Sequence, residues 1–151
     1  MSTTLVPQTL TVTVSSSIIL NGQPVNSENT LSVPNIAAID KRIVNVPTAS
    51  QVTLVTFGST VAAGQLVTGN VKFISIVNKD NTNFVRLRVT RTSQDTFDVE
   101  IPAGGYYIMM NPLLAANSTG AAFSSFVNAY NISAQADTGN VDVEFFAASI
   151  D

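Results

Sequence analysis

Histidine, cysteine and tryptophan are all absent from this chain of 151 residues. Without histidine the chain lacks the usual general base at neutral pH. Without cysteine it lacks thiol nucleophiles, soft metal ligands and disulfides. These absences disfavour most hydrolytic chemistry, and we expect no catalytic residues, no cofactor and no metal site. The stability of the folded chain must then come from packing or from the association of several copies.

Charge is also scarce, because Asp, Glu, Lys and Arg make up only 11% of the residues and the net charge is −3. A nucleic-acid partner normally requires a basic stripe, and a bilayer span requires roughly 18 consecutive apolar residues. The chain has neither, so we expect no nucleic-acid and no membrane partner. Since no Lys or Arg precedes Lys41, we also expect neither a signal peptide nor a transit peptide.

The opening stretch alternates strictly between two kinds of side chain. One parity is mostly apolar and the other is mostly hydroxylated: Leu10, Val12, Val14, Ser16, Ile18 and Leu20 against Thr9, Thr11, Thr13, Ser15, Ser17 and Ile19. This period is that of a β-strand with one apolar face. An uncharged strand of this length invites pairing with another chain. We therefore expect it to pair with strands of another subunit or to cross to a neighbour.

The Asn21-Gly22 dipeptide is a strong signal for a two-residue hairpin turn. It divides the opening stretch from a Ser/Asn-rich return that starts at Val25. We predict an N-terminal arm or hairpin over residues 1–35 and a single β-sandwich domain over residues 36–151. The first residues of this domain, Ile36 to Ile39, are predicted to form one helical turn.

Short alternating segments continue along the rest of the chain and are separated by turn residues at intervals of roughly ten. Strands are predicted over 51–57, 72–77, 84–90, 96–101, 106–110, 127–134 and 141–148. The second and third are expected to pair as a hairpin around the polar loop 78–83. With no amphipathic helix, the pattern predicts an all-β antiparallel sandwich, jelly-roll-like, with an extended N-terminal arm.

Four charged residues share faces on neighbouring predicted strands, Arg86 and Arg88 on one and Asp98 and Glu100 on the next. If these strands pair, opposite charges lie across a solvent face and set the register. An acidic pair beside arginines also suits a glycosidase or a ligand site. We favour the cross-strand ladder, because exposed pairs of this kind are common.

Three further groups have a structural and a functional interpretation. Asn78, Asp80 and Thr82 have the spacing of calcium-loop ligands but lack the glycine and the glutamate that such a loop needs. Asp142 and Glu144 suit a cation site with Asp137, or simply the outer face of the last strand. Tyr106 and Tyr107 point to opposite faces of a strand, so we predict one in the core and one, Tyr106, at an interface.

Two stretches resemble the small β-rich structural proteins of tailed-phage virions. The first is similar to the middle of those proteins and runs from Phe73 to Asn78, through a polar loop, and on to Phe84–Val89 and Phe97–Tyr106. The second is similar to their closing hairpin and comprises Ile132–Asp137, Gly139 and Val141–Ser149. The resemblance implies a non-enzymatic, homo-oligomeric protein that contacts copies of itself and the capsid or tail. It supplies no catalytic residues.

Three functions are compatible with these observations. One is a capsid decoration or cement protein. Another is a receptor- or carbohydrate-binding component of a tail, fibre or neck. The last is a jelly-roll enzyme, which the missing histidine disfavours.

We favour the first and expect a homotrimer, made in the host cytoplasm and bound to the major capsid protein on the virion surface. The trimer follows from shell geometry and the resemblance. The expected interface residues are Leu10, Val12, Val14, Ile18, Leu20, Arg86, Arg88 and Tyr106.

Overall fold

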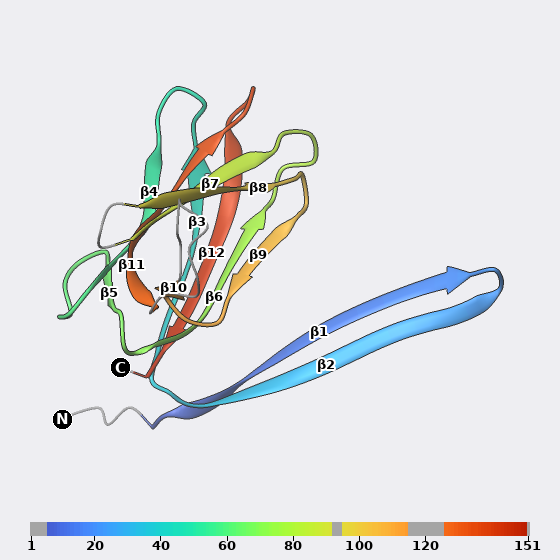
Figure 1. Ribbon diagram of the computed structural model, residues 1–151, viewed down its shortest axis with the longest axis horizontal. Coiled ribbons are helices and arrows are strands. Elements are labelled where there is room, and N and C mark those ends of the chain that lie inside the picture. Colours follow the sequence, from blue (N-terminus) through green and yellow to red (C-terminus); the bar gives the residue numbers. More distant parts are fainter. Residues whose placement is uncertain (1–5, 92–94, 115–125, 151) are drawn as a thin grey trace.

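The computed structural model describes residues 6–91, 95–114 and 126–150. All regular structure in these ranges is β, in twelve strands (Figure 1). They are β1 (Gln8–Leu20), β2 (Gln23–Ile36), β3 (Ala38–Val46), β4 (Val52–Gly58), β5 (Gln65–Val67), β6 (Val71–Asn78), β7 (Val85–Arg91), β8 (Thr96–Ile101), β9 (Tyr106–Met109), β10 (Leu113–Leu114), β11 (Val127–Ala136) and β12 (Val141–Ser149). The predicted all-β class is confirmed.

Two sheets form the body of the molecule. One has four strands in the order β3-β12-β6-β9, and the other has six, in the order β5-β4-β11-β7-β8 with β10 beside β11. All pairings within them are antiparallel except that of β4 with β5. Most of the buried apolar side chains of both sheets form one hydrophobic cluster, which includes Ile74, Leu87, Ile132 and Phe145. This arrangement is the predicted β-sandwich.

The predicted hairpin of 72–77 with 84–90 is wrong. Both segments are strands, but β6 pairs with β12 and β9, whereas β7 pairs with β11 and β8 in the other sheet. The polar loop between them crosses the sandwich instead of turning within a sheet. A side-chain amide holds this crossing: Asn78, 1% exposed, donates from Nδ2 to the carbonyl oxygens of Asn83, Ile101 and Pro102.

The closing hairpin that the resemblance implied is wrong for the same reason. β11 lies in the six-stranded sheet and β12 in the four-stranded one. The connection through Asp137 and Gly139 therefore also passes from one layer to the other. Alternating sequences specify a strand and its two faces, but they do not specify which strand lies next to it.

Strands β1 and β2 form a two-stranded sheet of their own, here called the ribbon, which extends away from the sandwich (Figure 1). Asn21 and Gly22 turn the chain with φ values of 51° and 78°, as a type I′ hairpin turn requires. This confirms the turn predicted from the dipeptide. The register pairs Leu10 with Val33 near one end and Leu20 with Gln23 at the other.

The predicted helical turn over Ile36–Ile39 is wrong. Ile36 ends β2, and β3 begins two residues later at Ala38. Asn35, with a positive φ of 63°, redirects the chain, and the Ala37 amide then donates to the Ser149 carbonyl oxygen at 3.0 Å. Asparagine tolerates this left-handed conformation better than most residues. The chain therefore passes from ribbon to sandwich through a sharp bend.

Truncating the core side chain of Leu87 tests the sandwich. Leu87 is fully buried, so Leu87→Ala should lower the free energy of unfolding by about 2–5 kcal/mol through lost burial and a cavity. Arg86→Ala, one residue earlier on the exposed face of β7, should cost much less. Denaturant unfolding followed by circular dichroism measures both. Equal effects of the two variants would contradict the assigned faces of β7.

Candidate interaction surface

The ribbon is amphipathic. Its register places the apolar parity of β1 on the same face as Val33, Leu31 and Val25 of β2, so this face is mostly apolar. The Ser16–Ser27 pair interrupts it in the middle. The other face carries hydroxyls, and Thr13 and Thr30 are 3.3 Å apart there across the strands. Each face of a two-stranded sheet is covered either by another layer of protein or by water. The apolar face is the one that gains from a protein cover, so it determines what the ribbon contacts.

The base of the ribbon is covered by the sandwich. Leu10, Val12 and Val33, here called the root, are partly buried and pack with buried Ile36, Phe73 and Ala148 and partly buried Phe146 and Ile150. The rings of Phe73 and Phe146 meet edge to face with centroids 6.0 Å apart. The root thus seats the ribbon on one end of the outer face of the four-stranded sheet.

Beyond the root the apolar face has no cover within the described residues. The distal ribbon, residues 13–30, exposes four large apolar side chains of this face: Val14 (53%), Ile18 (57%), Leu20 (59%) and Val25 (56%). Leu31, which lies just below it and pairs with Val12, is 44% exposed. Ile19, on the opposite face at the tip, is 73% exposed. An isolated two-stranded hairpin is only marginally stable in water. Association with another surface would therefore bury the exposed apolar side chains of the distal ribbon and stabilise it.

The outer face of the four-stranded sheet is also open beyond the root. Cross-strand pairing places two rows side by side, Ile43-Glu144-Val77-Tyr106 and Lys41-Phe146-Ser75-Ile108. These eight residues are here called the open sheet face. Ile43 is 64% exposed, Tyr106 is 73% exposed, and Ile108 is 45% exposed. Large apolar side chains grouped on one face of a soluble protein typically mark a contact surface.

The free edge of this sheet at β3 carries charges that point inward. Asp40 and Arg42 share the parity of buried Val46, and they form an ion pair of 3.3 Å. The Arg42 guanidinium lies 5.1 Å from the centroid of the Phe145 ring and donates to the Leu54 carbonyl oxygen of the other sheet. Inward charges on an edge strand oppose pairing with a further strand. Edge pairing at β3 is thus disfavoured.

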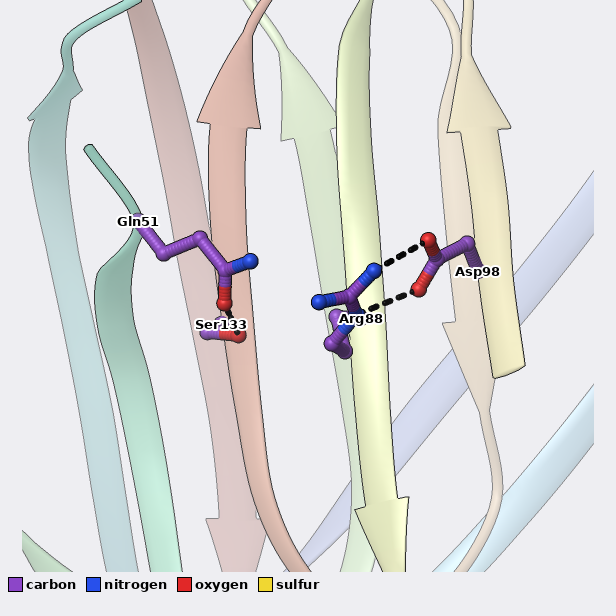
Figure 2. A network of polar contacts seen from close by, with 4 residues as sticks. All are labelled: Gln51, Arg88, Asp98 and Ser133. Atoms are coloured by element: carbon purple, nitrogen blue, oxygen red, sulfur yellow. Dashed lines mark hydrogen bonds and ion pairs between the residues drawn. The ribbon is translucent and has the colours of Figure 1, made fainter. Parts of the chain in front are cut away.

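The arginine ladder lies on the outer face of the other sheet. Arg86 is opposite Glu100 and Arg88 is opposite Asp98, which confirms the predicted register. Arg88 donates from Nε and from Nη2 to the two oxygens of Asp98, both at 2.7 Å (Figure 2). On the other side of Arg88, Ser133 donates to Gln51 at 3.2 Å. The bidentate Arg88–Asp98 pair links β7 and β8 in this register.

The structure brings some of the predicted interface residues together and separates others. Leu10, Val12, Val14, Ile18 and Leu20 share the apolar face of the ribbon. Tyr106 lies on the open sheet face, on the same side of the sandwich as the root, whereas Arg86 and Arg88 lie on the opposite sheet. Tyr107 packs against the core, and its burial raises the pKa of its phenol.

Sequence reasoning missed Ile39, Ile43 and Ile108, which are exposed on the outer face of the four-stranded sheet. Alternation in β3 could have indicated that Ile39 and Ile43 share a face. The parity that faces the core, however, contains Asp40 and Arg42, and charges normally indicate the solvent side. The inward charges therefore obscured the apolar outer face.

The acidic groups show structural roles. Asp80 Oδ1 accepts the backbone amides of Asn83 and Thr82, and these hydrogen bonds hold the pKa of Asp80 below its usual value. Asp142 accepts the side-chain amide of Asn45 at 2.8 Å. Within residues 6–91, 95–114 and 126–150, no group of three or more acidic side chains is placed to hold a metal ion. In the same ranges no helix is long and apolar enough to cross a membrane.

Comparisons with protein-family models, with curated proteins and with solved structures found no match to this chain.

Acid titration tests the Arg88–Asp98 pair. The hydrogen bonds from Arg88 lower the pKa of Asp98 from its usual 3.8, against an opposing effect of burial. A lowered folded-state pKa stabilises the fold above the unfolded pKa, and this stabilisation is lost as pH falls through the folded pKa. Asp98→Asn should therefore cost less than about 1 kcal/mol at pH 7, because the pair is exposed. The difference from the native chain should shrink as the pH falls below the unfolded-state pKa of about 3.9 and through the lower folded-state pKa of Asp98.

Urea unfolding of both proteins across this pH range measures the effect. Glu100→Gln, which removes a carboxylate from the same face of β8, is the control for loss of negative charge alone. A difference between Asp98→Asn and the native chain that persists undiminished at pH 2 would contradict this role of Asp98.

Shortening the ribbon tests whether the sandwich depends on its distal part. Deleting residues 14–19 together with 24–29 removes six register pairs but keeps the Asn21-Gly22 turn and the alternation of faces. Because the deleted side chains are exposed, the unfolding free energy should change by no more than about 0.5 kcal/mol. Leu10→Asp at the root should cost more, because it places a carboxylate against Phe73 and Ala148. Thermal unfolding of dilute samples measures both, and a large loss on shortening would mean that the distal ribbon belongs to the core.

Proposed function

We propose that this protein is a non-enzymatic structural component of a tailed-phage virion, a capsid decoration or cement protein. It stabilises the head through contacts with copies of itself and with the major capsid protein. The observation that carries the proposal is the uncovered apolar face of the distal ribbon. Cement proteins need large, largely neutral contact surfaces more than they need a pocket. The low content of charge, 11% of residues, supports the same function.

The strand orders support a jelly-roll assignment for the sandwich. Without the ribbon and the short strands β5 and β10, eight strands remain in two sheets of four, β3-β12-β6-β9 and β4-β11-β7-β8. The chain passes between the two sheets at β3–β4, β5–β6, β6–β7, β8–β9, β9–β10 and β11–β12. Double sheets of eight strands in two Greek keys define jelly rolls, which are frequent in viral capsid proteins.

The proposed assembly is a homotrimer on the outside of the capsid at its local threefold positions. The symmetry of the shell and the resemblance to phage structural proteins are its basis. The proposal places the protein on the virion after synthesis in the host cytoplasm. Neither nucleic acid nor a membrane is a partner in it.

Particle stability tests this function. Particles assembled without the protein should form but should release their genome at a lower temperature, or after a milder osmotic shock, than complete particles. Adding back the native chain should restore stability. Adding back Ile18→Asp should restore less, because the substitution places a carboxylate on the apolar ribbon face. Ser17→Asp adds the same charge to the hydroxylated face and serves as the matched control.

The alternative is a receptor- or carbohydrate-binding component of a tail, fibre or neck. The exposed ring of Tyr106 favours it, since flat aromatic side chains stack on sugars. Particles that lack the protein would then be as robust as complete ones but would fail to adsorb to cells. That result would replace the cement function with this one.

A further inference from the structure

Two mostly apolar surfaces of this chain are exposed. The distal ribbon presents Val14, Ile18, Leu20 and Val25 on one face, with the Ser16–Ser27 pair between them. The open sheet face presents exposed Ile43, Tyr106 and Ile108 around partly buried Phe146. Sheets pack face to face about 10 Å apart when both inner faces are apolar. Each surface is therefore a suitable cover for the other.

The root is a precedent for this packing within one chain. Leu10, Val12 and Val33 belong to the same ribbon face as Val14 and Ile18, and they already cover Phe73 and Ala148. Phe73 and Ala148 in turn are the next row of the same outer sheet face, since Ala148 pairs with both Ile39 and Phe73. The contact that the inference requires repeats a contact that the fold already contains.

The distal ribbon does not reach its own open sheet face, because it extends away from the sandwich beyond the root (Figure 1). Covering that face in the same chain would require the root contacts to break. A second copy satisfies both surfaces without this loss. A hollow of about 270 Å³ beside the root, lined by Val6, Leu10, Ile36 and Ile39 among others, continues the apolar surface toward the edge of β3.

Two strand edges near these surfaces are unsuited to pairing with a second copy. The inward charges Asp40 and Arg42 blunt the β3 edge, and Pro24 and Pro34 interrupt the donors of β2. The ribbon's apolar face carries no charged residue, because Glu28 pairs with Ser15 on the hydroxylated face. The open sheet face carries one charge of each sign, Lys41 and Glu144, and is neutral in total. The two faces therefore meet without an unbalanced charge.

We propose that the distal ribbon of one copy packs, apolar face down, on the open sheet face of a second copy. This inference rests on the proposed function, because it assumes that the exposed apolar surfaces serve self-association. It further specifies which two surfaces meet and that they pack face to face as layers. A chain that donates its ribbon and receives another one has both incomplete surfaces covered.

Engineered cysteines test the contact in the purified chain. Because the native chain has no cysteine, every disulfide formed is a designed one. Ile18→Cys mixed with Ile43→Cys or with Ile108→Cys should give mixed disulfide dimers under mild oxidation. Ile18→Cys mixed with Arg86→Cys, which is exposed on the opposite sheet, should give few. Dimers of Ile18→Cys with itself, or equal yield with Arg86→Cys, would overturn the inference.

Sedimentation of the full chain gives an independent measurement. Ile18→Asp should weaken self-association about tenfold or more, because docking would bury an unpaired carboxylate. Ser17→Asp, on the hydroxylated face, should leave association close to that of the native chain. Equal weakening by both variants, or a native chain that stays monomeric at high concentration, would overturn the inference. If that monomer still stabilised particles through its ribbon, the shell protein would be the occupant, and the cement function would stand without this contact.

Discussion

Strand β12 is apolar on its inner face and, near its C-terminal end, also on its outer face, and the sandwich and the ribbon both depend on it. Val143, Phe145 and Ala147 point into the core, and each is at most 2% exposed. Phe146 and Ala148 point outward and form the seat of the ribbon root. β12 also pairs along its length with β3 and β6. Because β12 contributes side chains both to the sandwich core and to the seat of the ribbon root, the orientation of the ribbon depends on the folding of the sandwich.

The fold class and most strands follow from the sequence because period-two alternation is a local property. The ribbon register follows from one dipeptide, Asn21-Gly22, whose positive φ values few other residues adopt readily. The pairing of β7 with β8 follows from the charge ladder, because Arg88 and Asp98 can meet only in that register. In each of these cases a few neighbouring residues contain the whole signal.

The sheet membership of β6, β7, β11 and β12 did not follow from the sequence. Polar loops such as 78–83 suit a hairpin turn and a crossing between layers equally well. What distinguishes the two is the buried amide of Asn78, whose acceptors Ile101 and Pro102 are remote in sequence. The open sheet face was missed for a related reason. Its exposure depends on how far the root extends over the sheet, which no local pattern encodes.

The composition of the ribbon determines how it withstands proteolysis. A protruding extended strand is the shape that many protease clefts bind, and the distal side chains of β1 and β2 are exposed. Proteases of the trypsin and chymotrypsin types select basic or large apolar, chiefly aromatic, residues at the cut site. Residues 6–40 contain no Lys, Arg, Phe, Tyr or Trp, and Lys41 lies in β3, which is paired with β12. The exposed distal ribbon thus offers such proteases no basic and no aromatic residue at which to cut.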